Sequence, residues 1–199
     1  MRIGFSCALV AIVTAALSVV GCGDQPAGKA AQPAPAADPV PKPVSPGETA
    51  ATPDRLGPRY DATLAQGIDF ARRGYPQFVA DVSGISDFES WGRWSDANLG
   101  PSVRIRFRQA LPSKLTLEIT ANAFGPNLGQ AVRVRIGQAE QEFVHSDPRV
   151  PGSYRLSFDA VGGDTIEIIP PRPVSPAEVA GTTDVRKVGI GLIALKVFE

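Results

Sequence analysis

Residues 103–108 have the sequence VRIRFR, in which apolar side chains alternate with arginines. A period of two places one side of an extended chain on a core and the other side in water, which is the pattern of a half-buried β-strand. The same alternation occurs in LTLEIT at 115–120, VRVRI at 132–136 and YRLSF at 154–158. These four segments predict a domain built from β-strands.

Other segments have the length and composition of strands. The further strands that we predict are residues 67–71, 78–82, 91–95, 141–145, 165–169 and 187–198. The last of them is apolar on both faces around 190–195, which favours a central position in a sheet. Gly, Pro, Asn and Asp cluster at 124–129 and 161–164, as tight turns require. No segment of the domain shows a helical stripe, and residues 176–180 can form a short turn of helix at most.

About ten short strands separated by turns predict an all-β fold. We expect a β-sandwich, specifically a jelly roll of the galactose-binding-like type. This domain is placed at residues 59–199, because ~140 residues suffice for one compact domain.

The N-terminal segment has the layout of a secretory signal peptide. Arg2 precedes an almost unbroken apolar run at 7–20, and Gly21 and Cys22 follow the run. The segment resembles a bacterial lipoprotein signal, which implies cleavage before Cys22 and acylation of that cysteine. We therefore predict a signal peptide at 1–21 and a lipid anchor, with palmitate, at Cys22. The alternative is a retained transmembrane helix, although the run is shorter than the ~20 residues that a hydrocarbon core requires.

Residues 22–58 are predicted to be a disordered tether between membrane and domain. After Cys22 the segment is rich in Pro and Ala and has no aromatic residue. Such a segment buries too little apolar surface to offset its ordering entropy. Gly23, not Asp, follows Cys22. By resemblance to proteobacterial sorting signals, this favours the periplasmic face of the outer membrane.

Composition speaks against several classes of function. The formal net charge is zero, and about −1 once Arg2 leaves with the signal, so we expect no nucleic acid partner. Cys7 leaves with the signal and Cys22 carries lipid, so the domain has no thiol, and His145 is its single histidine. This composition argues against a transition-metal site. We expect no cofactor, because no glycine-rich phosphate loop precedes a helix.

Residues 89–96, ESWGRWSD, contain both tryptophans of the chain. Aromatic rings stack on the apolar face of a pyranose, and Arg, Asp, Glu and Ser side chains hydrogen-bond to its hydroxyl groups. Trp91, Arg93 and Trp94 are therefore our first candidates for a ligand surface. On a strand, Trp91 and Arg93 would share one face and Trp94 would lie on the other. The alternative is that one or both indoles belong to the core.

Two further groups of charged residues attract attention. Five arginines lie on the polar faces of two predicted strands: Arg104, Arg106, Arg108, Arg133 and Arg135. If those strands are neighbours, the guanidinium groups would form a basic surface for acidic glycans; otherwise they are a solvated face paired with acids such as Glu118. Asp184 and Arg186 lie two positions apart, so they either bind a common ligand or form a structural salt bridge.

Several short motifs together resemble an uncharacterised β-sandwich domain of bacterial envelope proteins. They are QGIDF at 66–70, WGRWS at 91–95, FGPN at 124–127, VSP at 174–176 and DVRKVGIGL at 184–192. In that family the domain occurs at the C-terminus of phosphoglycerol-transferase-like membrane proteins and beside glycosyltransferase modules. The resemblance implies a jelly-roll-like domain in a glycan-handling setting, without established catalytic residues, and here we expect it to stand alone on a lipid tether. Asn127, in the third motif, joins Asp184 and Arg186 as a weaker ligand candidate.

Our leading hypothesis is a lipid-anchored cell-envelope protein. Its non-enzymatic domain would bind carbohydrate or assist envelope glycan assembly. The alternative is a protein-interaction module that docks on an envelope enzyme. A glycan hydrolase is a second alternative, for which loop carboxylates such as Asp87, Glu89 and Asp96 would have to converge across a scissile bond.

Overall fold

A computed structural model describes residues 56–159 and 162–199. The chain divides into two units, Met1–Gly47 and Glu48–Glu199, and all described residues belong to the second. The predicted signal peptide, Cys22 and nearly all of the predicted tether lie outside the described residues, so these assignments stay predictions. Within the described ranges, no helix has the length and apolar character needed to cross a membrane.

Twelve strands, one short α-helix and one 3₁₀ turn follow one another in the described part of the chain. The strands are β1 (Arg59–Tyr60), β2 (Ile68–Asp69), β3 (Tyr75–Pro76), β4 (Val79–Ser83), β5 (Arg93–Asp96), β6 (Val103–Phe107), β7 (Lys114–Ala123), β8 (Ala131–Ile136), β9 (Ala139–Val144), β10 (Gly152–Asp159), β11 (Thr165–Ile169) and β12 (Val188–Phe198). The turn η1 is Gly125–Asn127 and the helix α1 is Pro176–Ala180. Each predicted strand overlaps an observed one. The sequence did not predict β1 and β3, because two-residue strands carry no alternation.

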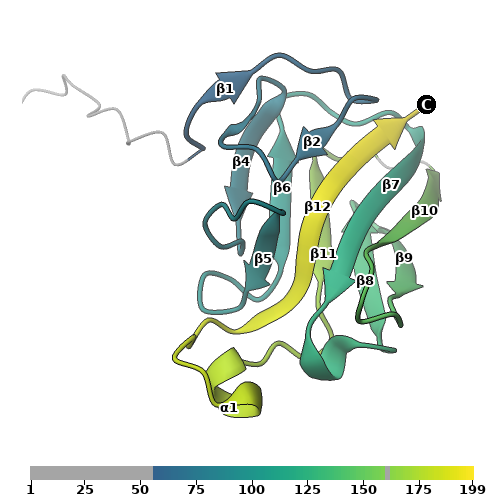
Figure 1. Ribbon diagram of the computed structural model, residues 1–199. Helices are drawn as coiled ribbons and strands as arrows, with labels where there is room; N and C mark the ends of the chain where they lie inside the picture. Colours follow the sequence, from purple (N-terminus) through teal and green to yellow (C-terminus); the bar gives the residue numbers. More distant parts are fainter. Residues whose placement is uncertain (1–55, 160–161) are drawn as a thin grey trace, which may run out of the picture. The chain divides into compact units, whose positions relative to one another are not determined.

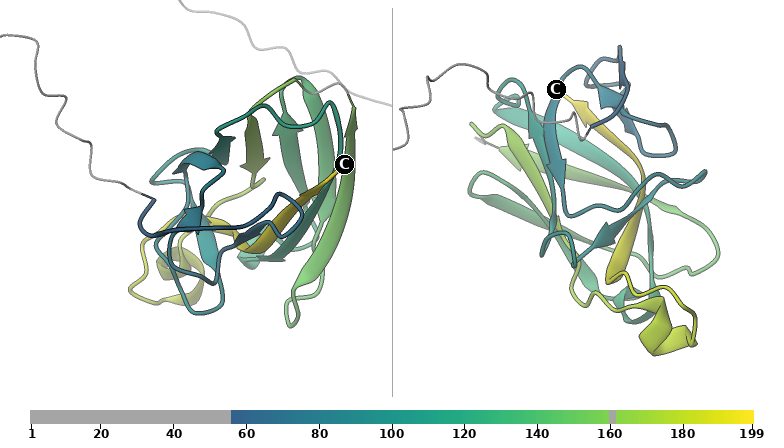
Figure 2. Two further views of the ribbon diagram at one scale, coloured as in Figure 1. Left: turned by 90° about the horizontal axis from the view of Figure 1, so that it is seen from above. Right: turned by 90° about the vertical axis from the view of Figure 1, so that its left-hand side faces the viewer.

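Two five-stranded antiparallel sheets face each other (Figure 1; Figure 2). One has the order β10-β7-β12-β2, with β5 also paired to β12, and the other has the order β4-β6-β11-β8-β9. From β5 to β12, strands of one sheet are followed by strands of the other. β5, β7, β10 and β12 lie in the first sheet, and β6, β8, β9 and β11 lie in the second. This is the strand order of a jelly roll, so the predicted all-β sandwich is confirmed.

Buried and exposed residues alternate along the strands, as the sequence predicts. In β6, Val103, Ile105 and Phe107 are buried, whereas Arg104 and Arg106 are exposed. Buried Ile, Leu, Val and Phe side chains from both sheets form one core between the layers. The outer face of each sheet points away from this core, so a ligand-binding site can lie there.

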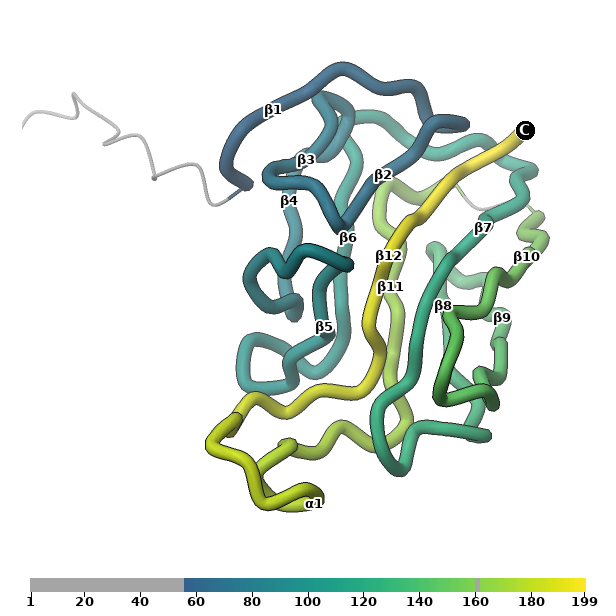
Figure 3. Tube along the Cα trace, in the orientation of Figure 1, coloured from purple at the N-terminus to yellow at the C-terminus, as the bar shows by residue number. Residues whose placement is uncertain are grey.

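β12 is central in its sheet, as its apolar composition predicts (Figure 3). It pairs with β7 along one side; along the other it pairs first with β5, over 188–192, and then with β2, at 194–195. Its register against β7 shifts between Leu192 and Ala194, which makes Ile193 the extra residue of a bulge. The bulge lies where the partner changes from β5 to β2.

The short helix α1 turns the chain back before β12. Ser175 caps its N-terminus by accepting from the Glu178 N–H at 3.2 Å, and the Glu178 carboxylate accepts from the Ser175 N–H at 3.1 Å. Gly181 ends the helix with φ of 64°, a conformation that glycine adopts readily. The Ala177 N–H then donates to the carbonyl of Asp184 at 2.9 Å. The helical turn predicted at 176–180 is therefore confirmed, and it holds the segment that carries Asp184.

Candidate functional site

A tight turn places Trp91 beside Trp94. The Glu89 N–H donates to the Gly92 carbonyl at 2.9 Å, and the Gly92 N–H donates back to Glu89 at 3.1 Å. Trp91 therefore lies at the tip of a turn, and β5 begins only at Arg93. Gly92 is required at this point, because a Cβ would lie 2.3 Å from the carbonyl oxygen of Leu192.

The two indoles and Phe124 form a group of half-buried rings, which we call the aromatic surface. The ring centroids of Trp91 and Trp94 are 4.9 Å apart with an interplanar angle of 65°, and those of Trp94 and Phe124 are 5.9 Å apart at 72°. Both indoles lie over Gly191, where a Cβ would be 2.6 Å from the Trp91 ring. Because the adjacent Leu192 is fully buried in the core, the aromatic surface lies on the outer face of the sheet.

Arg93 lies on the other face of β5, which corrects the expectation that it shares a face with Trp91. In the register of β5 and β12, Arg93 is opposite Leu192, whereas Trp94 is opposite Gly191. The expectation failed because Trp91 belongs to a turn, where the alternation of a strand does not apply. Arg93 is 9% exposed, and its guanidinium carbon lies 4.9 Å from the ring centroid of Tyr75.

Three charged side chains adjoin the aromatic surface, and we call them the polar cluster: Glu89, Asp184 and Arg186. The Trp91 Nε1–H donates to Glu89 Oε2 at 2.9 Å, and Arg186 Nη1 donates to Glu89 Oε1 at 2.8 Å. Arg186 also donates to Asp184 from Nη2 at 2.7 Å and from Nε at 3.1 Å. About a third of each charged side chain is exposed, namely 33% for Glu89, 31% for Asp184 and 34% for Arg186.

The charges of the polar cluster are mutually stabilised. The hydrogen bonds from Arg186 hold the pKa of Asp184 below its usual range, and those to Asp184 raise the pKa of Arg186. Asp184 and Arg186 are therefore both charged at neutral pH. The cluster presents two carboxylates and one guanidinium, which together can accept and donate hydrogen bonds to a polar ligand.

Side chains of the β5 strand and the loop after it position the segment that carries Arg186. Asp96 Oδ1 accepts from the Lys187 N–H at 3.1 Å, and Asn98 Nδ2 donates to the carbonyl of Val185 at 3.1 Å. Ser95 Oγ accepts from the backbone N–H groups of Gly189 at 3.1 Å and of Ile190 at 2.9 Å. The motif WGRWS thus supplies both the indoles and an anchor for the start of β12.

Asn127 has a structural place. It is fully buried, and its Nδ2 donates to the carbonyls of Phe124 and Arg172, both at 2.9 Å. Its Oδ1 accepts from the Arg172 N–H at 2.9 Å. Both polar ends of the amide are therefore used to join two loops, and we leave Asn127 out of the ligand surface.

The structure thus brings Trp91, Trp94, Asp184 and Arg186 together and leaves Arg93 and Asn127 apart from them. Sequence reasoning gave Glu89 only as one of several loop acids and did not single out Phe124. Glu89 and Arg186 are 97 positions apart, so no local pattern indicates their contact. The one available signal is that Arg186 lies within a motif of the family resemblance and Glu89 lies two residues before one.

The strands that carry the arginines are not neighbours. Arg104 and Arg106 lie in β6, Arg133 and Arg135 lie in β8, and β11 separates these two strands, while Arg108 follows the end of β6. Glu167 of β11 accepts from Arg135 Nη1 at 3.4 Å, and Glu140 accepts from Arg135 Nη2 at 2.8 Å. Glu118 lies in the other sheet, where it pairs with Arg155 at 2.9 Å. The interpretation as a solvated face paired with acids therefore holds for Arg135, with acids other than Glu118.

His145 is locally bonded, and no metal-binding group surrounds it. It is 2% exposed, and its Nδ1 lies 2.6 Å from the hydroxyl of Tyr154. Over residues 56–159 and 162–199, no three His, Cys, Asp or Glu side chains are grouped in a way that could hold a metal ion.

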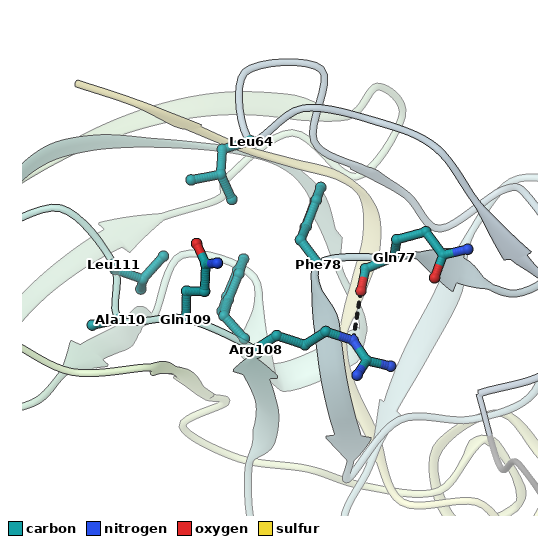
Figure 4. Close-up of a pocket in the computed structure, with 8 residues that line it drawn as sticks. Leu64, Gln77, Phe78, Arg108, Gln109, Ala110 and Leu111 are labelled. Atoms are coloured by element: carbon teal, nitrogen blue, oxygen red, sulfur yellow. Dashed lines mark hydrogen bonds between the residues drawn. The ribbon is translucent and has the colours of Figure 1, made fainter.

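A pocket of about 300 Å³ lies apart from the six ligand candidates (Figure 4). Phe78 and Phe107, whose rings stack at 5.7 Å, line it together with Leu64 and Leu111. Arg108 at its rim donates from Nε to the carbonyl of Gln77 at 2.7 Å. The pocket is mainly apolar and contains none of the six ligand candidates.

Residues 57–199 match the family described as "Domain of unknown function (DUF7024)". The chain belongs to this family. The DUF7024 match includes the whole aromatic surface and polar cluster.

Phosphoglycerol transferase I of Escherichia coli O139:H28 is 42% identical to this chain over 138 residues, and so is Phosphoglycerol transferase I of Shigella boydii serotype 18. Each match covers 68% of this chain but only 18% of the transferase, in its C-terminal region. The predicted resemblance of this DUF7024 domain to the C-terminal domain of such proteins is therefore confirmed.

A solved structure described as "BiXyn10A CBM1 APO" has a weak similarity to the DUF7024 chain. It is 14% identical with a TM-score of 0.41, and the match covers 69% of this chain and 99% of that one.

Proposed function

We propose that the domain binds carbohydrate at the aromatic surface and the polar cluster, without catalysing a reaction. The observation that carries this proposal is the carboxylate of Glu89, which accepts hydrogen bonds from both Trp91 and Arg186. The Glu89 carboxylate holds the indole of Trp91 beside the charged donors and acceptors of the polar cluster.

The chemistry of a sugar fits this combination. The C–H face of a pyranose packs on an aromatic ring, and its hydroxyl groups need both donors and acceptors at the ring edge. Asp184 and Glu89 offer carboxylate oxygens, and Arg186 offers N–H groups between them. Since tertiary contacts already hold the groups, binding would cost little additional ordering of side chains.

The same geometry argues against hydrolysis. A two-carboxylate glycosidase requires one carboxyl with a raised pKa as general acid. The hydrogen bonds from Arg186 instead lower the pKa of Asp184. The guanidinium of Arg186 also bridges Asp184 and Glu89, so it occupies the place that a scissile bond would need.

The family membership supports a setting in the cell envelope. The relatives are named for the transfer of phosphoglycerol, and this chain spans 18% of their length. We infer that the domain is an accessory part that holds an envelope glycan for assembly or modification by a separate enzyme. The transferase activity itself is not part of this proposal.

We also propose a lipid anchor at Cys22 that places the domain at the periplasmic face of the outer membrane. Val19-Val20-Gly21-Cys22 at the end of the apolar run supports this location. Growth with labelled palmitate should label the wild-type protein but not the Cys22→Ala variant. An unlabelled wild type would overturn the anchor without affecting the carbohydrate proposal.

Calorimetric titration of the full chain against purified envelope glycans tests the binding proposal. Trp91→Leu and Trp94→Leu should each weaken binding at least tenfold while a cooperative unfolding transition is retained. Phe78→Leu is the matched control, since it removes an aromatic ring from a stacked pair outside the site. The site assignment fails if both tryptophan variants bind normally, or if both simply unfold.

A protein-docking function is the second candidate, because one specific observation favours it. Val185, between the two paired residues of the polar cluster, is 71% exposed. An exposed branched apolar side chain suits a protein partner better than a sugar. Co-purification of an envelope enzyme that added glycans do not displace, and that Val185→Ser abolishes, would favour this candidate.

A further inference from the structure

The side chain of Arg93 is buried, and no carboxylate of residues 56–159 and 162–199 supplies a counter-charge to it. The side chain is 9% exposed, its Nε has no hydrogen-bond partner, and it forms no ion pair with any described carboxylate. Its described contacts are with rings, at 4.9 Å from the Tyr75 centroid and 6.0 Å from the Phe88 centroid. Burial of an unpaired charge is strongly unfavourable, and ring contacts compensate for it only in part.

A second unpartnered polar group lies next to Arg93. Tyr75 is 3% exposed, and its buried hydroxyl has no hydrogen-bond partner. Burial raises the pKa of Tyr75 to about 12, so the phenol keeps its proton at neutral pH and remains a donor. Two donors thus lie side by side without an acceptor.

Both donors line open space. Arg93 lines one pocket of about 240 Å³, which Tyr75 also lines, and a second of about 500 Å³, which Arg73 lines. The guanidinium carbon of Arg73 lies 5.2 Å from the ring centroid of Phe88, the same ring that Arg93 approaches. The exposed carboxylate of Asp87 lines both pockets as well, so two guanidinium groups face one carboxylate and the local charge is positive.

We propose that Arg93, Arg73 and Tyr75 form a binding site for the phosphate group of a small phosphate ester. A phosphate suits the site better than a single carboxylate, because its three terminal oxygens can accept from two guanidinium groups and a phenol at once. A bound phosphate would supply the counter-charge that Arg93 lacks and the acceptor that Tyr75 lacks. The exposed Asp87 would then lie near the alcohol part of the ester.

This site is separate from the carbohydrate surface. Arg93 and Trp94 point to opposite faces of β5, as their pairing with Leu192 and Gly191 shows. The inference does not rest on the proposed function, and either can fail without the other.

Calorimetric titration of the full chain with inorganic phosphate, glycerol phosphate, glycerol and acetate is the test. Inorganic phosphate and glycerol phosphate should bind saturably, and glycerol and acetate should not. Arg73→Met should weaken phosphate binding at least tenfold, and the exposed Arg72→Met should leave it unchanged. Arg93→Met should abolish binding. Tyr75→Phe keeps the ring and should weaken binding about threefold or more. This second variant tests the site even if Arg93→Met does not fold.

Three results would overturn the proposal. The first is no binding of either phosphate by the wild type. The second is binding that Arg73→Met and Tyr75→Phe leave unchanged, which would place the phosphate elsewhere. The third is saturable binding of acetate as tight as that of inorganic phosphate, because a single carboxylate would then satisfy the site.

Discussion

Arg186 Nη1 donates a hydrogen bond to Glu89 Oε1 at 2.8 Å, across 97 positions of the chain. The other oxygen of the same carboxylate accepts from the indole of Trp91 at 2.9 Å. One side chain therefore links the turn that carries the indoles to the segment that precedes the last strand. A substitution of Arg186 should therefore change both the stability of the domain and the orientation of the Trp91 side chain.

Arg186→Met should lower the free energy of unfolding by about 1 kcal/mol, because a third of each partner is exposed and water screens the ion pairs. Urea unfolding monitored by circular dichroism measures the change. The control is Arg149→Met, whose ion pair with Asp147 is 3.4 Å long and more exposed, and which should cost at most a few tenths of a kcal/mol. Equal losses in the two variants would contradict a special role for Arg186.

The pKa of Asp184 should lie below the ~3.9 of an unperturbed aspartate, and Arg186→Met should return it toward that value. Because the folded-state pKa is depressed, the pair contributes stability above about pH 3.9, and this contribution is lost as the pH falls through the folded-state pKa. A ¹³C NMR titration of the Asp184 carboxyl measures its pKa in the wild type and in Arg186→Met. The same midpoint in wild type and variant would show that Arg186 does not control Asp184.

Gly191→Ala should disturb the aromatic surface from below. The added Cβ would lie 2.6 Å from the Trp91 ring and 2.9 Å from the Trp94 ring, so both indoles must move. We expect a shifted tryptophan emission maximum and a loss of stability of about 1–3 kcal/mol, as for overpacked sites. An unchanged emission spectrum would mean that the indoles do not rest on β12.

Asn127→Ala should be the most destabilising of these changes, at about 2–4 kcal/mol, because it removes the three hydrogen bonds of a fully buried amide and leaves the N–H and the carbonyl of Arg172 without their described partner. Asn98→Ala is the control, since it removes one exposed hydrogen bond to Val185. Chemical denaturation of both variants gives the comparison. A decrease in the free energy of unfolding of less than about 1 kcal/mol for Asn127→Ala would contradict the role of Asn127 in joining the two loops.

The alternating patterns predicted the sandwich because burial follows sequence directly within a strand. The segment at 103–108 contains β6, the segment at 115–120 lies in β7, and the segment at 187–198, which is apolar on both faces, contains the central strand β12. The ends of the strands were less accurate. The strand predicted at 141–145 is β9, which begins at Ala139 and ends at Val144, so His145 lies just beyond it.

The site could be predicted only in part, since its geometry depends on contacts across the fold. Trp91 and Arg93 were placed on one face by extending strand alternation into residues that form a turn. The pairing of Glu89 with Arg186 arises where β12 pairs with β5. The burial of Asn127 arises where its loop meets the loop of Arg172. No spacing within a single segment carries that information.

The most direct test of the central claim is a tryptophan fluorescence titration of the full chain with a panel of envelope glycans. Trp91 and Trp94 are the two tryptophans of the chain, so the whole signal reports on the proposed surface. The account predicts a saturable change with one class of glycan, and a much weaker response in Arg186→Met. A flat response of the folded wild type to every glycan would contradict carbohydrate binding at this surface.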